Sequence, residues 1–199
     1  RKKITPEVMD YLEANQISVK PYLEVEQDLK RQAKRRLVIS SSLNGQLKSA
    51  IKNPITLSPS PVSLMKCIKN ETEQNGFRRA MERDGVAMVK FLKWLKPAVE
   101  AGGQTELSID KKLYEYRAEQ AHFKGVSFDT IAGYGAHGAI VHYEATPETD
   151  VQLESRGLLL LDSGAQYLDG TTDLTRTIPL GLLTDDEKRN YTLVLKGML

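Results

Sequence analysis

Two aspartates in the segment LLLLDSGAQYLDGTTDLTRTIPLG, residues 158–181, have the type and spacing to hold a cation. Asp162 follows a run of four leucines, and Asp173 comes eleven residues later, after the turn-forming sequence YLDG. A hairpin would place the two side chains roughly opposite each other, where cross-strand Cβ atoms lie about 4.5–5.5 Å apart. Carboxylates that close repel, so either one of them is protonated or a multivalent cation lies between them.

The residues alone also allow two arrangements of the aspartate pair without a cation. The first is an exposed hairpin with solvated acids. The four leucines weaken it, because they predict a strand buried on both faces, and buried carboxylates need partners. The second is an ion pair of one aspartate with Arg176, a basic residue nearby.

His142, twenty residues before Asp162, is a third candidate for chemistry. Its segment GAIVHYEA predicts a short apolar strand, where a single histidine is usually a core residue. Beside a carboxylate-rich cation site it could instead donate a hydrogen bond to a developing oxyanion, or transfer a proton to a leaving amine. His137, in the loop YGAHGA, is assigned no role.

The elements that must position these residues follow from periodicity and capping. Apolar residues three and four apart predict a long amphipathic helix over 70–96, and the pattern over 108–120 predicts a second helix. Short apolar runs between about 123 and 180, separated by Gly, Pro and Asp, predict several strands. Thr184 and Glu187 form a capping box before a third helix. The order helix, helix, antiparallel strands, helix is typical of an α+β fold.

The first part of the chain differs in character from the rest. Residues 17–23 predict a strand, and 26–36 predict a basic, solvated helix. Closely spaced prolines in NPITLSPSPV, residues 53–62, predict an extended connector. We therefore expect one domain over residues 1–58 and a second over 59–199.

Composition excludes several classes of function. With 28 basic and 26 acidic residues the net charge is +2, too small to attract nucleic acid or a membrane surface. The apolar runs, such as the four leucines, are far shorter than the ~20 residues of a membrane span. The single cysteine, Cys67, cannot form an internal disulfide and is expected in the core. With no visible signal peptide, this favours a reducing, cytoplasmic location.

Taken together, the segments DSGAQYLDGTTDLTRT, GAIVHYEATPET and NETEQNGFRRAMERDGVAMVKFLKWL resemble the Xaa-Pro aminopeptidases (aminopeptidase P). These enzymes belong with the methionine aminopeptidases, prolidases and creatinases of the pita-bread fold. The resemblance runs from about Pro59 to Leu199 and implies that residues 59–199 are the first half of the catalytic domain. Residues 1–58 resemble, less specifically, the end of the second N-terminal domain of the three-domain members.

The resemblance implies a two-metal hydrolase that removes an N-terminal residue preceding proline. In this family five side chains hold two divalent ions, commonly manganese, which lower the pKa of a bound water. Asp162 matches the first ligand, Asp173 matches the second, bridging ligand, and His142 matches the non-ligand histidine that contacts the substrate. It also implies a proline-containing peptide substrate, a homodimer in the intact protein, and neither nucleic acid nor membrane as a partner.

The sequence departs from the family pattern in two places. His137 stands where the family usually has asparagine. After Asp173 the chain has no histidine and one glutamate, Glu187, so three of the five ligands lack counterparts. Both ends of the chain read as cuts in a longer protein, and we expect the chain alone to be inactive although its parent is an enzyme. The alternatives are a prolidase or a non-catalytic pita-bread module that binds peptides.

Overall fold

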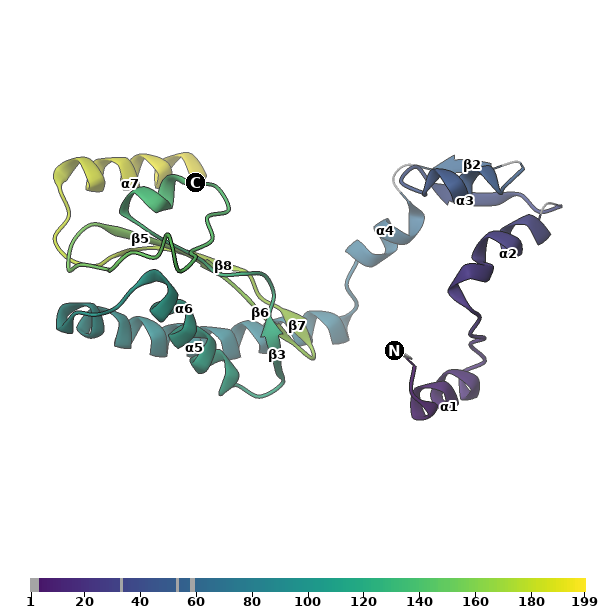
Figure 1. Ribbon diagram of the computed structural model, residues 1–199, viewed down its shortest axis with the longest axis horizontal. Helices are drawn as coiled ribbons and strands as arrows, with labels where there is room; N and C mark the ends of the chain where they lie inside the picture. Colours follow the sequence, from purple (N-terminus) through teal and green to yellow (C-terminus); the bar gives the residue numbers. More distant parts are fainter. Residues whose placement is uncertain (1–3, 33, 53, 58–59) are drawn as a thin grey trace. The chain divides into compact units, whose positions relative to one another are not determined.

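The computed structural model describes residues 4–32, 34–52, 54–57 and 60–199 of the chain (Figure 1). The chain divides into two compact units, Arg1–Ile68 and Lys69–Leu199. Within the described residues, no helix combines the length and the apolar character needed to cross a membrane. The expected boundary between residues 58 and 59 lies outside the described residues, and the domain limits stay a prediction.

The first unit contains a pair of short parallel strands. β1 (Leu37–Ser40) pairs with β2 (Pro54–Leu57), and Leu37 lies opposite Pro54. Pro54 takes the first position of its strand, where the missing N–H disturbs the ladder least. The other elements of the unit are α1 (Pro6–Ala14), η1 (Tyr22–Glu24), α2 (Val25–Arg31), α3 (Gly45–Ser49) and α4 (Pro61–Cys67).

Three expectations for this unit are wrong. Residues 17–21 have no regular structure instead of a strand, because Ile17 and Val19 are exposed and pair with no other segment among the described residues. The expected connector over 53–62 contains β2, because a proline at the edge of a strand does not prevent pairing. Cys67 is exposed at the end of α4 rather than buried.

The second unit begins with two helices. α5 (Glu71–Ala101) starts after Asn70, whose side chain accepts the Glu73 backbone N–H while the Glu73 carboxylate accepts the Asn70 N–H. This capping box satisfies two backbone donors that would otherwise lack partners. α6 (Glu106–Ala118) follows a turn in which Gly102 has a φ of 86°, a conformation that favours glycine. The long helix and the second helix are therefore confirmed.

The strands form two antiparallel three-stranded sheets. One has the order β4-β5-β8, with bounds Ile131–Tyr134, Leu158–Ser163 and Leu174–Pro179. The other has the order β3-β6-β7, with bounds Phe123–Val126, Ala165–Tyr167 and Gly170–Thr171. The chain passes from β5 to β8 through the β6–β7 hairpin, whose turn at Leu168 and Asp169 is the expected YLDG turn.

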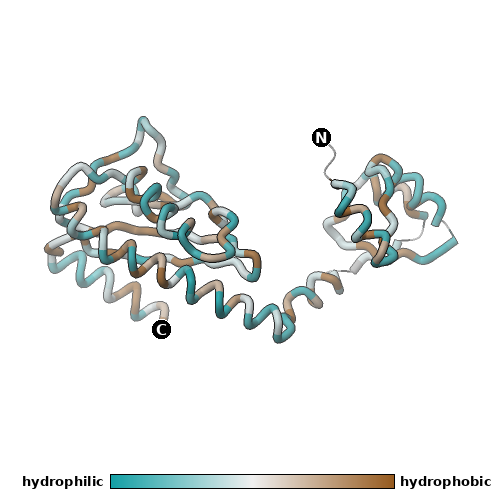
Figure 2. The backbone as a smooth tube through the Cα atoms, turned by 90° about the horizontal axis from the view of Figure 1, so that it is seen from below, coloured by the Kyte–Doolittle hydropathy of each residue, from teal (hydrophilic) through white to brown (hydrophobic). Residues whose placement is uncertain are grey.

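The core lies between α5, α6 and β5. Hydrophobic and hydrophilic residues alternate along α5 in Figure 2, as an amphipathic helix requires. The larger of two clusters of buried hydrophobic residues includes Met88, Phe91, Leu95, Val99, Ile109, Leu113, Leu159, Leu161 and Leu180, and the smaller consists of Ala80, Ala165 and Tyr167. β5 was expected to be buried on both faces, but its burial alternates, because the core covers only the face that carries Leu159 and Leu161.

The segment GAIVHYEA is not a strand. η2 (Gly135–Ala139) leads instead into a turn at Val141 and His142. His142 is exposed and has a φ of 56°, a left-handed conformation that strand pairing does not allow. The alternating pattern therefore predicted the wrong element around this histidine.

α7 (Asp185–Met198) completes the unit. Its predicted capping box is confirmed: Thr184 accepts the Glu187 N–H, and the Glu187 carboxylate accepts the Thr184 N–H. In Figure 1 the sheet with β5 and β8 lies between α5 and α6 on one side and α7 on the other. None of the described residues of α7 is buried. This arrangement of helices around antiparallel strands confirms the expected α+β class.

Candidate metal centre

Asp162 lies near the end of β5, on the face of the strand that the core does not cover. Leu159 and Leu161 on the opposite face are each 0% exposed, whereas Asp162 is half-buried. The Thr175 hydroxyl of β8 donates a hydrogen bond of 2.8 Å to Oδ1 of Asp162. An ionised carboxylate has about four lone-pair sites, so Asp162 keeps the capacity to bind a further ligand.

Asp173 directly precedes β8 and lies diagonally across from Asp162. The register pairs Asp162 with Thr175 and Ser163 with Leu174, so Asp173 falls two residues before the partner of Asp162. Residues two apart share a face of a strand, and such diagonal neighbours lie about 7–8 Å apart. The two aspartates, expected roughly opposite each other, are therefore offset by two residues, because β6 and β7 take up the intervening chain. Asp173 is exposed.

The β6–β7 hairpin between the two aspartates is fastened to α5. Arg79 and Arg83 of α5 form ion pairs with the carboxylate of Asp169 in the hairpin turn. Gly76 allows this approach, because a Cβ there would overlap the Asp169 carbonyl oxygen. Burial raises the pKa of the Asp169 carboxyl, but Arg83 and Arg79 lower it more, and the net pKa lies below the usual value. These contacts attach the turn of the β6–β7 hairpin to α5.

Arg176, the alternative partner of the aspartates, has a different contact. It lies opposite Leu161 in the register, and its Nη1 donates to the Thr175 carbonyl oxygen at 2.7 Å. Among the described residues, no ion pair joins it to Asp162 or Asp173. The structure therefore does not favour an ion pair between Arg176 and either aspartate.

Two carboxylates on one face of a sheet suit a hard divalent cation, which prefers oxygen ligands. Such cations usually take about six or more ligands, counting waters. Within the part of the chain that the structure describes, no group of three or more His, Cys, Asp and Glu side chains could hold a metal ion. The aspartate pair therefore fits a portion of a metal site.

His142 lies in the loop between β4 and β5. It is exposed in the turn after η2, and among the described residues it makes no hydrogen bond to Asp162 or Asp173. The strand register thus places the two predicted ligands with an offset of two residues, and the predicted substrate-contacting histidine lies on a separate loop.

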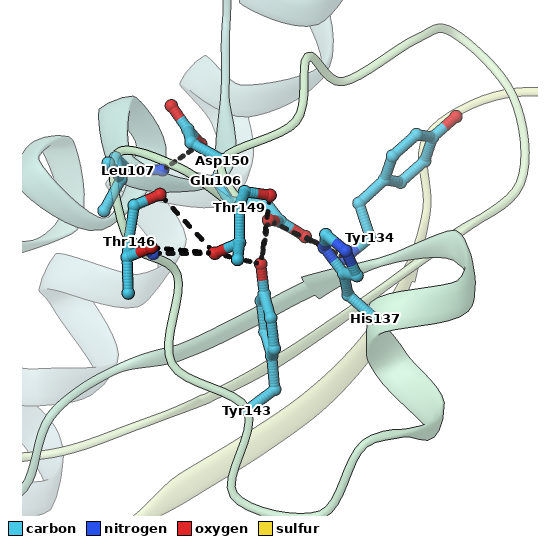
Figure 3. A network of polar contacts seen from close by, with 8 residues as sticks. All are labelled: Glu106, Leu107, Tyr134, His137, Tyr143, Thr146, Thr149 and Asp150. Atoms are coloured by element: carbon cyan, nitrogen blue, oxygen red, sulfur yellow. Dashed lines mark hydrogen bonds and ion pairs between the residues drawn. The ribbon is translucent and has the colours of Figure 1, made fainter.

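A buried carboxylate holds the loop that carries His142 (Figure 3). Glu106, the first residue of α6, is 0% exposed and accepts hydrogen bonds from the Tyr134 N–H at 2.7 Å and the Tyr143 hydroxyl at 2.8 Å. Nδ1 of His137 lies 3.0 Å from each carboxylate oxygen. Burial raises the pKa of the Tyr143 phenol, and the nearby Glu106 carboxylate raises it further.

Sequence reasoning missed the role of Glu106. A glutamate in the first turn of a helix usually interacts with the helix dipole at the surface. One signal in the sequence could have indicated this contact. His137 replaces the asparagine that the family usually has in this loop, and a different polar side chain at that position indicates a specific hydrogen-bond partner.

Residues 75–199 match the metallopeptidase family M24, and residues 1–73 match the creatinase/prolidase N-terminal domain. A protein of Sclerotinia sclerotiorum named probable Xaa-Pro aminopeptidase P is 38% identical over 208 residues, which cover 98% of this chain and 35% of that protein. A protein of the same name from Podospora anserina is 39% identical over 210 residues, covering 98% of this chain and 31% of that protein.

Solved structures show the same relationship. The X-prolyl aminopeptidase of Caenorhabditis elegans, described as a cytosolic enzyme with a di-nuclear active site, matches with a TM-score of 0.92 and 30% identity. The match covers 99% of this chain and 34% of that one. The prolidase of Pyrococcus horikoshii matches with a TM-score of 0.73 and 25% identity, covering 94% of this chain and 54% of that one.

These matches confirm the resemblance to the Xaa-Pro aminopeptidases and the pita-bread architecture. The chain spans about a third of the length of the curated relatives it matches. The M24 match covers the whole segment that carries both aspartates and the histidine loop. The chain therefore belongs to metallopeptidase family M24.

Proposed function

We propose that the protein to which this chain belongs is an Xaa-Pro aminopeptidase, a metallo-exopeptidase that removes the N-terminal residue from peptides with proline in second position. Relatives named probable Xaa-Pro aminopeptidase P, which align with 98% of the chain, support this activity. The observation that carries the proposal is the pair Asp162 and Asp173 on one sheet face of an M24 chain.

Asp162 and Asp173 are the proposed ligands that would help to hold two divalent metal ions, with manganese as the expected metal. The di-nuclear active site of the C. elegans enzyme supports the number of ions. When bound, the ions would lower the pKa of a shared water and polarise the scissile carbonyl. Thr175 orients the Asp162 carboxylate through its hydrogen bond, as outer-shell partners of metal ligands commonly do.

His142 is the proposed substrate-contacting residue. Its exposed imidazole is free to donate a hydrogen bond to the oxyanion of the tetrahedral intermediate, or to give a proton to the leaving amine. Pre-organised donors of this kind lower the barrier because they need no reorganisation when charge develops.

The 199-residue chain alone is expected to be inactive. After Asp173 it has no histidine and one glutamate, Glu187, whose carboxylate already accepts the Thr184 N–H at 2.7 Å. Two aspartates without the other three ligands of the family would hold a metal ion weakly. For the intact protein we propose a cytoplasmic homodimer that acts on proline-containing peptides, with neither nucleic acid nor membrane as a partner.

Prolidase activity is the second candidate, favoured by the shared fold of the P. horikoshii prolidase. A prolidase cleaves Xaa-Pro dipeptides, whereas an aminopeptidase P also cleaves longer peptides. A non-catalytic peptide-binding module is the third possibility, and it would bind such peptides without turnover.

The test compares the full-length protein with the 199-residue chain, each with added Mn²⁺. The substrates are a longer peptide with proline in second position, the same peptide with alanine there, and an Xaa-Pro dipeptide, and both cleavage and peptide binding are measured. We expect the full-length protein to cleave the longer proline peptide but not the alanine peptide, and the chain alone to cleave none of the three above a metal-only blank. Cleavage restricted to dipeptides would instead support a prolidase, and binding without cleavage a module.

Variants of the full-length protein test the proposed ligands. D162N and D173N should each abolish turnover, because each replaces a charged ligand with a neutral amide. D186N, which changes an exposed aspartate at the start of α7, is the matched control and should keep wild-type activity. Full activity in D162N or D173N would refute the assignment of the metal ligands.

A further inference from the structure

The backbone of His142 is held in a strained conformation by its surroundings. Its φ of 56° lies in the left-handed region, which few residues other than glycine adopt. Such conformations persist only where neighbouring structure enforces them. The His142 side chain is exposed, so the contacts that enforce this conformation must come from the residues around it.

The residues on both sides of His142 are tied to the same carboxylate (Figure 3). On one side, the Tyr143 hydroxyl donates to Oε2 of Glu106 at 2.8 Å, and Tyr143 is only 7% exposed. On the other side, Nδ1 of His137 lies 3.0 Å from both Glu106 oxygens. Glu106 therefore clamps the loop before and after His142.

Further contacts close the loop on itself. The rings of His137 and Tyr143 stack, with centroids 4.4 Å apart and planes inclined by 29°. The Ile140 N–H donates to the His137 carbonyl oxygen at 3.1 Å, and the Tyr143 N–H donates to the Ile140 carbonyl oxygen at 3.2 Å. His142 thus lies between residues whose backbone and side chains are both fixed.

The contacts of Glu106 with Tyr134, His137 and Tyr143 form a clamp on the loop, and this clamp depends on each of the three hydrogen-bond donors. Its side chain is 0% exposed, so hydrogen bonds from the protein must replace the lost hydration. To donate to a carboxylate, His137 must carry its proton on Nδ1. His137 is also the donor that spans both oxygens, because Tyr134 contacts Oε1 and Tyr143 contacts Oε2.

We propose that Glu106 and His137 are positioning residues that fix the loop 135–143 and thereby keep His142 in the conformation in which it contacts the substrate. Both residues act through the backbone on either side of His142. The role of His142 rests on the proposed function, whereas the clamp on the loop is independent of it.

The first experiment measures amide hydrogen exchange by NMR in the 199-residue chain. H137A should speed exchange at the Ile140 and Tyr143 amides by at least about tenfold and leave the Leu161 amide in the core unchanged. H137N keeps a side-chain donor for Glu106 and should restore most of the protection. Unchanged exchange at Ile140 and Tyr143 in H137A would overturn the proposal.

E106Q tests the carboxylate directly, because glutamine turns a donor toward one of the partners that now donate to Glu106. It should speed exchange at the same loop amides, whereas E115Q, which changes an exposed glutamate of the same helix, should not. If the Leu161 amide in E106Q also loses its protection from exchange, the variant has unfolded. The comparison of H137A with H137N then decides whether the contact with Glu106 fixes the loop.

The second experiment measures kcat and KM of the full-length protein per metal-loaded site. H137A should lower kcat by about tenfold with little change in KM or metal content, and H137N should restore it. Wild-type kcat in H137A would refute positioning of His142 even if the loop exchanges faster. If the wild-type protein has no peptidase activity, the proposed function fails, while the exchange experiment still decides whether the clamp exists.

Discussion

Removal of the Arg117 guanidinium should strongly destabilise the second unit. Arg117 of α6 is 1% exposed and forms a two-bond ion pair with Asp84 of α5, which is 0% exposed, through Nε at 2.8 Å and Nη2 at 3.0 Å. The Tyr167 hydroxyl of β6 also donates to Asp84, at 3.1 Å. This ion pair therefore joins both helices to the hairpin that separates Asp162 from Asp173.

The expected magnitude follows from burial. In R117L, the Asp84 carboxylate would stay buried with a single remaining hydrogen bond, from Tyr167. Removing one partner of a buried ion pair costs about 3–5 kcal/mol, a large share of the ~5–15 kcal/mol by which domains are stable. The double variant D84N/R117L removes the buried charge as well and should recover at least about 1 kcal/mol of that loss.

Urea unfolding followed by fluorescence measures this change. The chain has a single tryptophan, Trp94 in α5, so the signal reports on the second unit. R78L, which alters an exposed arginine of the same helix, is the control and should change stability by no more than about 0.5 kcal/mol. A loss below about 1 kcal/mol in R117L, or a double variant as unstable as the single one, would refute the reasoning.

Three further predictions concern the same unit and use the same urea titration. D110N should raise stability near pH 7, because burial raises the pKa of the Asp110 carboxyl despite its hydrogen bond with Thr130. A carboxyl whose pKa is higher in the folded than in the unfolded state destabilises the folded protein as the pH rises through that pKa. The gain in D110N should therefore disappear below about pH 3, where the Asp110 carboxyl is protonated in both the folded and the unfolded state. A gain that persists below that pH would contradict this cause. N70A removes the N-cap of α5 and should cost about 1 kcal/mol; an unchanged midpoint would show that the cap contributes nothing. G164A places a Cβ against the Thr172 carbonyl oxygen and should lower the free energy of unfolding by about 1–3 kcal/mol. An unchanged free energy of unfolding in G164A would contradict this prediction.

The helices could be predicted because their signals are local. Asn70 and Thr184 cap their helices through contacts with residues three positions away, which the sequence shows directly. Residues 17–23 and the segment GAIVHYEA also alternate like strands, but a strand needs a partner, and no pattern within a segment specifies that partner. Strand predictions therefore failed where no neighbouring strand was available.

For the candidate site, the sequence indicated Asp162 and Asp173 as metal ligands, and that assignment stays a prediction. Their register could not be predicted: Asp173 falls two residues before the strand partner of Asp162. Asp169, in the hairpin between the two aspartates, contacts Arg79 of α5, 90 residues away in sequence, and a local pattern does not show such a contact. The burial of Glu106 could not be predicted from a local pattern either, because its hydrogen-bond partners lie 28 to 37 residues away in sequence.

The side on which Asp162 projects follows from the cost of burying its carboxylate. Leu159 and Leu161 are 0% exposed, and because side chains alternate along a strand, a slip of one residue would expose both and carry Asp162 into the core. Leu158 and Leu160 would take their places in the core, so the leucines alone do not oppose the slip. An unpaired carboxylate buried in the core would carry a desolvation penalty, and this penalty keeps Asp162, the first proposed metal ligand, on the face away from the core.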